Sequence, residues 1–130
     1  LDVEVVDTIC SLEVAQKAQE LLREVVVAGT ATRAFKNAPY NFSGKTGTAQ
    51  IKAEKVYSAT FIGYFPAENP KYTIYVMLTD LYHEYYASTV AAPVARTIAD
   101  KLYAIDKSFF KTITVDSTKK TIDEIICNLN

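Results

Sequence analysis

The eight residues at positions 43 to 50 read Ser43-Gly44-Lys45-Thr46-Gly47-Thr48-Ala49-Gln50, and the interpretation of the whole chain depends on them. They combine one lysine, two threonine hydroxyls and two glycines. Glycine has no Cβ, so a backbone that contains it can approach a ligand closely. A cation and hydroxyls on such a backbone are suited to holding a carboxylate or a phosphate. The stretch therefore predicts an anion-binding site.

Two known motifs compete for this stretch. Gly44-Lys45-Thr46 looks like the end of a phosphate-binding P-loop, but that motif needs a glycine five residues before Gly44, where Pro39 stands. The run that starts at Lys45 instead matches the K-T-G element of serine β-lactamases and penicillin-binding proteins. A plain glycine-rich turn is the third interpretation, and it is disfavoured because lysine and paired threonines serve a turn poorly.

The flanking sequence carries a wider resemblance. Its runs are Ala28-Gly29-Thr30-Ala31, Phe61-Ile62-Gly63-Tyr64-Phe65-Pro66-Ala67, Asn69-Pro70-Lys71-Tyr72 and Val90-Ala91-Ala92-Pro93-Val94. Together with the motif, they resemble the closing portion of a penicillin-binding protein transpeptidase domain of class B. The cell-division transpeptidase is the nearest match that the runs indicate. The resemblance covers about residues 10–105, in the order that the family has.

The composition is that of a globular chain. Of the 130 residues, 49% are hydrophobic and 22% are charged, which is enough to build the core of one domain. Fourteen basic residues balance fifteen acidic ones, so no nucleic-acid partner is expected. Neither a signal peptide nor a membrane-spanning run is present in the sequence, and we expect the targeting segment to belong to a longer parent protein.

The hydrophobic pattern predicts an α+β fold: an antiparallel sheet with helices packed on it, as a fragment of the penicillin-binding and serine β-lactamase fold. Residues 11–27 have apolar side chains every three to four positions and a capping serine, so they predict a helix with one stripe facing a core. Residues 1–7 alternate and predict a possible N-terminal strand. Residues 30–41 have no clean period and predict a loop.

Three strands are expected after the loop, at residues 42–52, 56–65 and 72–79. The short connections between them predict an antiparallel meander. The third run is almost continuously apolar, which predicts a central strand with both faces covered. A helix is expected over about 89–103, with Val90, Val94, Ile98 and Leu102 at a spacing of four. Pro93 should lie within or near its first turn, so the regular helix should begin close to Ala91.

The resemblance divides the chain into two parts. Residues 1–105 are expected to be the C-terminal portion of a transpeptidase domain, and residues 106–130 a weakly structured tail. In that tail, Phe110, Ile113 and Val115 hint at a strand, and residues 122–129 hint at a short helix.

The resemblance also implies which residues bind the substrate and what each of them does. Lys45 is expected to attract the terminal carboxylate of the substrate and to tune a relay hydroxyl, and Thr46 and Thr48 to bind that carboxylate. The backbone N–H of Thr48 is expected to be one oxyanion-hole donor, a kind of contact worth ~2.7–4 kcal/mol of transition-state stabilisation. At Gly47, a Cβ would obstruct a substrate that lies along the strand. No cofactor and no metal are implied.

The family also needs S-x-x-K and S-x-N elements. S-x-x-K occurs at Ser108–Lys111 and Ser117–Lys120, but both matches follow the Lys-Thr-Gly run, whereas the nucleophile of the family precedes it. Chance is the favoured explanation for both. S-x-N does not occur in the sequence. The nucleophile is therefore expected to lie outside this chain, which by itself should be catalytically inactive.

A histidine, three tyrosines and two cysteines outside the motif are further candidates for a role. His83 is the only histidine, and Glu84 alone does not complete a metal-ligand set. Tyr82, Tyr85 and Tyr86 around it predict a solvated loop, or else the rim of a substrate groove. Cys10 and Cys127 lie at opposite ends of the sequence and are expected to be two free thiols.

The leading hypothesis is a serine-type D,D-transpeptidase that cross-links the stem peptides of peptidoglycan and is acylated by β-lactams. The resemblance implies cell-wall synthesis proteins as partners, and a parent anchored in the cytoplasmic membrane with this domain outside the cytoplasm. A serine β-lactamase or carboxypeptidase, and a non-catalytic scaffold or sensor with the same fold, remain alternatives. The chain by itself is expected to self-associate through an exposed face or an edge strand.

Overall fold

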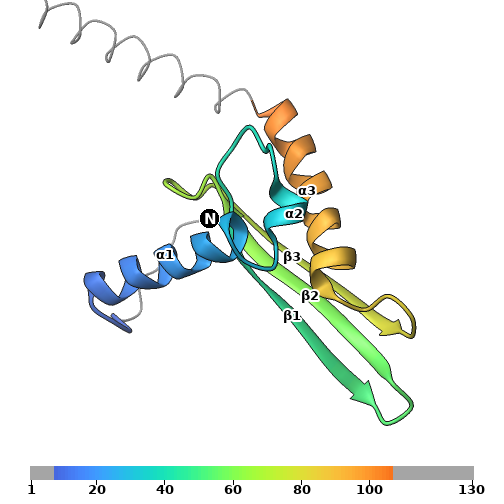
Figure 1. The fold of residues 1–130 in the computed structure, drawn as a ribbon. Helices are drawn as coiled ribbons and strands as arrows, with labels where there is room; N and C mark the ends of the chain where they lie inside the picture. The colour runs from blue at the N-terminus through green and yellow to red at the C-terminus, as the bar shows by residue number, and fades with distance from the viewer. Residues whose placement is uncertain (1–7, 107–130) are drawn as a thin grey trace, which may run out of the picture. The chain divides into compact units, whose positions relative to one another are not determined.

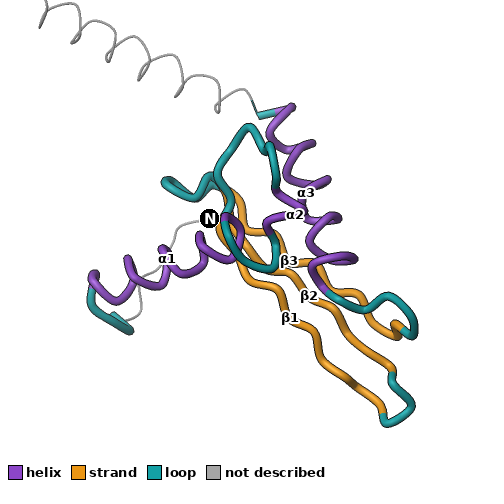
Figure 2. The backbone as a smooth tube through the Cα atoms, viewed as in Figure 1, coloured by secondary structure: helices purple, strands orange, loops and turns teal. Residues whose placement is uncertain are grey.

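A computed structural model describes residues 8–106 of the chain. Its elements are α1 (Leu12–Val27), α2 (Thr32–Phe35), β1 (Ser43–Lys52), β2 (Val56–Phe65), β3 (Tyr72–Leu81) and α3 (Ala87–Ile105). They are labelled in Figure 1, and Figure 2 separates helices from strands by colour. The chain divides into two compact units, Leu1–Thr97 and Ile98–Asn130. The first unit holds the sheet, and the second begins within α3.

The three strands form one antiparallel sheet in the order β1-β2-β3, which confirms the predicted meander (Figure 2). Three residues join β1 to β2, and the last of them, Lys55, has a φ of 59°. A left-handed residue in that place is typical of three-residue hairpin loops. The peptide bond between Phe65 and Pro66, where β2 ends, is cis.

Aromatic side chains fill the core on one face of the sheet. Phe61 and Phe65 of β2 are fully buried, and so is Phe42, which directly precedes β1. The Phe42 ring stacks on Phe65 with centroids 5.3 Å apart, and it lies 4.4 Å from the ring of Phe35 in α2. Aromatic pairs at such distances contribute stability beyond the area that they bury. This cluster therefore fixes the start of β1 against the sheet and against α2.

A glycine pair lets the backbones of β1 and β2 come together beneath this cluster. Gly44 and Gly63 face each other across the two strands. A Cβ on Gly63 would lie 2.5 Å from the carbonyl oxygen of Ser43 and would collide with the ring of Phe42. No glycine among the described residues has a positive φ. The glycines at this point therefore serve close approach and not unusual dihedral angles.

Helix α1 confirms the predicted helix and its cap, because the Ser11 hydroxyl accepts a hydrogen bond from the N–H of Val14 at 3.3 Å. The apolar stripe of the helix is only partly covered within the described residues. Val26 is buried, whereas Leu21 is 62% exposed and Val14 is 56% exposed. The predicted core-facing stripe is thus realised at the C-terminal end of α1 alone.

Helix α3 corrects two predictions. It begins at Ala87, and Pro93 lies inside it instead of in its first turn. Its buried residues within the first unit are alanines, at positions 87, 91, 92 and 95, whereas Val94 is 41% exposed. Alanine side chains let a helix lie close to its neighbours, which explains why the stripe follows the small residues and not the larger valines.

Two further predictions are wrong. The segment 30–41 was expected to be a loop, but it contains the single-turn helix α2. β3 was expected to be central, but it lies at one edge of the described sheet, and its residues alternate between buried and exposed. β2 occupies the central position because a meander places its second strand there. The possible strand at residues 1–7, both S-x-x-K matches and the hints of structure after residue 106 lie outside the described residues.

Candidate functional site

The Lys45–Thr48 run lies in the first half of β1, which is an edge strand of the described sheet. Thr46 and Thr48 are paired with the buried residues Phe61 and Ala59 of β2, whereas Lys45 is paired with the exposed Ile62. Paired residues share a face of a sheet and successive residues alternate. The two threonine side chains therefore lie on the core face, and Lys45 projects from the opposite face. Both faces meet at the free edge of β1.

Thr46 is held by a residue that precedes the strand. The hydroxyls of Thr30 and Thr46 lie 2.8 Å apart and share a hydrogen bond. Thr30 follows the end of α1, in the Ala28–Ala31 run that contributed to the family resemblance. No local spacing in the sequence indicates that these two residues meet.

Thr48 is held by α3. The N–H of Ala87, the first residue of that helix, donates to Thr48 Oγ1 at 3.1 Å. The first N–H groups of a helix have no partner within the helix, so a strand hydroxyl satisfies one of them here. The Thr48 oxygen accepts this bond, which leaves its own proton available for another acceptor.

Lys45 is exposed, and its Nζ donates to the carbonyl oxygen of Thr46 at 2.8 Å. This contact is local to the strand and leaves the other N–H groups of the ammonium free for an anion. Gly47 lies beside Lys45 on the same face. In addition to the predicted obstruction of a substrate, a side chain at this position would meet a neighbouring residue of the sheet. A Cβ at Gly47 would lie 2.6 Å from Thr60 Oγ1, the hydroxyl that donates to the carbonyl oxygen of Gly47.

Tyrosines lie near the end of β1 that follows the motif, where Tyr57 of β2 is paired with Gln50. The rings of Tyr57 on β2 and Tyr85 before α3 stack with centroids 3.8 Å apart. A hydrogen bond with the Tyr85 side chain raises the pKa of the exposed Tyr86 phenol above its ordinary value. His83 is exposed, as the solvated-loop prediction expected.

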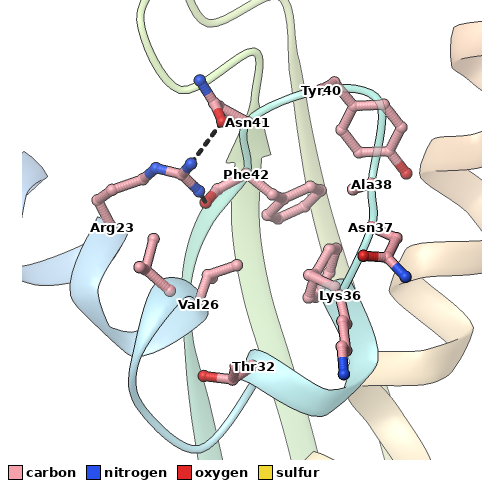
Figure 3. A pocket seen from close by; sticks show the side chains of 11 residues that line it. Arg23, Val26, Thr32, Lys36, Asn37, Ala38, Tyr40, Asn41 and Phe42 are labelled. Carbon is pink, nitrogen blue, oxygen red and sulfur yellow. Dashed lines mark hydrogen bonds between the residues drawn. The ribbon is translucent and has the colours of Figure 1, made fainter.

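A separate pocket of about 240 Å³ lies between the end of α1 and the segment that leads into β1 (Figure 3). Arg23 of α1 points toward this segment and donates to the carbonyl oxygen of Phe42 at 2.9 Å and to the side chain of Asn41. Asn41 in turn donates to the Glu68 carboxylate. None of the motif residues lines this pocket. Arg23 therefore anchors the entry to the motif strand and takes no direct part in the site.

Within residues 8–106, no group of three or more His, Cys, Asp or Glu side chains is placed to hold a metal ion. Cys10 is a free, exposed thiol, and Cys127 lies outside the described residues. Over the same range, none of the helices has the length and apolar character needed to cross a membrane.

Comparison with known proteins identifies the family. The family model described as "Penicillin binding protein transpeptidase domain" matches residues 3–100. The chain therefore belongs to the penicillin-binding protein transpeptidase family, which confirms the resemblance seen in its sequence and the class B character of that resemblance.

Curated relatives agree with this assignment. Stage V sporulation protein D of Bacillus subtilis is 34% identical over 69% of this chain and 15% of its own length. Peptidoglycan D,D-transpeptidase FtsI of Buchnera aphidicola is 30% identical over 73% of this chain and 18% of its own length. Penicillin-binding protein 2A of B. subtilis is 28% identical over 84% of this chain and 17% of its own length. The chain thus spans less than a fifth of the length of these relatives.

Solved structures confirm the fold. Pseudomonas aeruginosa PBP2, solved in complex with WCK 5153, matches with a TM-score of 0.65 and 29% identity over 82% of this chain and 24% of that one. PBP2 of Helicobacter pylori, solved in complex with MreC, matches with a TM-score of 0.58 and 23% identity, over 74% of this chain and 19% of that one. The predicted α+β class, as a fragment of the penicillin-binding fold, is confirmed.

Proposed function

We propose that this chain supplies the carboxylate-binding strand of a serine-type D,D-transpeptidase that cross-links the stem peptides of peptidoglycan. The observation that carries the proposal is the run Lys45-Thr46-Gly47-Thr48 on a strand with a free edge. Relatives named peptidoglycan D,D-transpeptidase support it. We infer that residues 1–105 form the C-terminal portion of the catalytic domain and that 106–130 form an appended tail.

Each motif residue has a role that its position on β1 allows. The Lys45 ammonium attracts the terminal carboxylate of a stem peptide or a β-lactam, because an exposed cation with free N–H groups acts as a charge-assisted donor. The Thr46 and Thr48 hydroxyls donate to the same carboxylate. Gly47 keeps the strand open to a substrate that lies along it. The N–H of Thr48 donates to the oxyanion that forms when the scissile carbonyl is attacked.

The nucleophile of this reaction belongs to a part of the protein that precedes the chain. A serine hydroxyl there attacks the carbonyl and gives its proton to a neighbouring base. The tetrahedral intermediate collapses to the acyl-enzyme as the leaving amine departs with a proton, and the amine of an acceptor stem peptide then displaces the serine and forms the cross-link. Without that serine, the chain alone has no acylation activity. The parent is anchored in the cytoplasmic membrane, its catalytic domain lies outside the cytoplasm, and its partners are other proteins of cell-wall synthesis.

The proposal is tested by labelling with a fluorescent penicillin. This chain and the full-length protein that carries it are incubated with the label under identical conditions and are compared on a denaturing gel. We expect a covalent label on the full-length protein and none on the chain. A folded full-length protein that takes no label would refute the transpeptidase and favour a non-catalytic scaffold. A labelled chain would instead assign the nucleophile to Ser108 or Ser117.

Labelling alone does not separate a transpeptidase from a β-lactamase or a carboxypeptidase. The lifetime of the acyl-enzyme and its fate do so. A β-lactamase hydrolyses the acyl-enzyme within the assay and releases opened penicillin, whereas a transpeptidase keeps the label and transfers the acyl group of a stem-peptide donor to an added amine acceptor. Turnover of penicillin, or release of the donor to water alone, would contradict the proposal.

A further inference from the structure

Either hydroxyl can donate in the hydrogen bond between Thr30 and Thr46, and a bound anion would favour one of the two directions. A hydroxyl has one proton and two lone pairs. In the 2.8 Å contact either oxygen can be the donor. If Thr46 donates to Thr30, its proton is occupied and cannot reach a carboxylate. If Thr30 donates, the Thr46 proton is free to point outward.

A bound carboxylate accepts hydrogen bonds and donates none. It therefore favours the arrangement in which Thr30 donates to Thr46 and Thr46 donates to the anion. Hydrogen bonds in such a chain strengthen each other by polarisation, by roughly 10–30% per bond. The hydrogen bond at Thr48 runs in the same direction, because the N–H of Ala87 donates to the Thr48 oxygen and leaves the Thr48 hydroxyl proton free. In the arrangement that an anion favours, both motif hydroxyls thus receive a bond from an element outside the strand.

Thr30 is held in place by its own turn. Ala31 is fully buried, and its N–H donates to the carbonyl oxygen of Val25 at 3.1 Å. The Thr32 hydroxyl donates to the carbonyl oxygen of Gly29 at 2.8 Å. At Gly29 a Cβ would lie 2.8 Å from the Cα of Val25, so the turn can pack this closely on α1 only with glycine. Thr30 is therefore flanked on both sides by fixed residues.

We propose that Thr30 is a positioning residue of the carboxylate site, which acts through Thr46 by holding and polarising its hydroxyl. This inference rests on the proposed function, because it takes the Thr46 hydroxyl to be a carboxylate donor. Thr30 itself need not touch the substrate.

The test measures acylation of the full-length protein by benzylpenicillin and by its methyl ester. The ester presents the same ring without the negative charge. Thr30→Val removes the hydroxyl while it preserves the shape of the side chain, and Thr30→Ser restores a hydroxyl. Thr97→Val is the matched control, because it removes the hydroxyl of an exposed threonine that donates only to Pro93 within α3 and does not contact the motif. Thermal melting of each variant checks that it is folded.

Thr30→Val is expected to slow acylation by benzylpenicillin about 3- to 10-fold, as the loss of one polarising hydrogen bond would. Acylation by the ester should change less than about 2-fold, because it has no carboxylate for Thr46 to bind. Thr30→Ser should restore the rate, and Thr97→Val should leave it unchanged. In a Thr46→Val background, Thr30→Val should have no further effect, because the residue through which it acts is gone.

Several results would overturn the inference. An equal loss with acid and ester would assign Thr30 a structural role. So would a loss in Thr97→Val as large as in Thr30→Val, or additive effects of Thr30→Val and Thr46→Val. Wild-type rates in Thr30→Val would also refute it and leave the proposed function intact. If the wild-type protein is not acylated by either compound, the proposed function itself fails and the inference fails with it.

Discussion

Ala87 and Thr48 join the start of α3 to the motif strand, because the N–H of Ala87 donates to Thr48 Oγ1 at 3.1 Å across 39 positions of the sequence. Ala87 is almost completely buried, so its N–H has little access to water if this bond is lost. The hydroxyl of Thr48 thus has a structural partner as well as the ligand that we propose for it. A change at Thr48 should therefore be visible in stability and in activity.

The first prediction concerns this bond. Thr48→Val keeps the shape of the side chain and leaves the Ala87 N–H unpaired, which should lower the free energy of unfolding by ~1–3 kcal/mol. Thr48→Ser keeps the hydroxyl and should cost much less. Chemical denaturation of the full-length variants measures both. Equal stability of the valine and serine variants would contradict the structural role of the bond.

The second prediction concerns two glycines of the sheet that differ in what surrounds them. Gly63→Ala places a Cβ against the backbone of Ser43 and the ring of Phe42, and this overpacking should cost ~1–3 kcal/mol. Gly47→Ala meets only the Thr60 side chain, which can rotate, and should cost less than about 1 kcal/mol.

The loss of acylation rate should rank the same two variants in the opposite order to their loss of stability. Gly47→Ala should reduce the acylation rate of the folded protein more than Gly63→Ala, because its Cβ would meet a substrate that lies along β1. Melting curves and acylation rates of both variants provide the comparison. If Gly47→Ala is acylated at the wild-type rate, its glycine serves only the contact with Thr60.

The third prediction concerns the charge of Lys45. Because the side chain is exposed and bonds only to its own strand, Lys45→Met should leave the thermal stability nearly unchanged. Its acylation by a carboxylate-bearing penicillin should fall about 10- to 100-fold, which corresponds to one hydrogen bond with a charged group. Wild-type acylation should also slow as salt is added, whereas the variant should respond less. Lys36→Met, at another exposed lysine, is the control and should behave like the wild type.

The local elements of this fold could be predicted from local patterns. Ser11 and the spacing that follows it predicted α1, and the short connections between apolar runs predicted the meander. The position of β3 could not be read in this way, because its exposed face carries the large hydrophobic side chains Tyr75 and Met77, while Ile74 and Val76 lie on its buried face. Hydropathy alone therefore made an alternating strand look continuously buried.

The site, too, could be predicted where a local pattern exists and not where residues far apart in the sequence meet. A recognisable motif predicted Lys45 and Thr46, but the residue that holds Thr46 lies 16 positions away in the sequence. Such contacts depend on where folding places α1 relative to β1. Helix α3 shows a similar limit, because its valines have a helical spacing that points to a core, whereas packing selected the alanines between them. Small residues leave no hydrophobic signal as strong as that of the larger ones.

The last prediction concerns the face of the sheet that carries Lys45. Ile62 pairs with Tyr75 and Thr60 with Met77, so these residues share the face opposite to the aromatic core. Tyr75 is 60% exposed and Met77 is 52% exposed. An apolar face of this kind associates readily, and β1 and β3 are both edge strands of the described sheet, which adds unpaired backbone groups.

We therefore expect this chain by itself to self-associate, with an average mass in sedimentation equilibrium that rises with concentration. Met77→Lys should reduce the association, because it places a charge on the apolar face. Ala53→Lys, in the turn between β1 and β2, adds the same charge away from that face and should have little effect. A wild-type chain that stays monomeric at high concentration would refute the prediction. If association persists in Met77→Lys and is reduced instead by a proline in β1 or β3, the chains pair through a strand edge, because proline removes the backbone donor that such pairing needs.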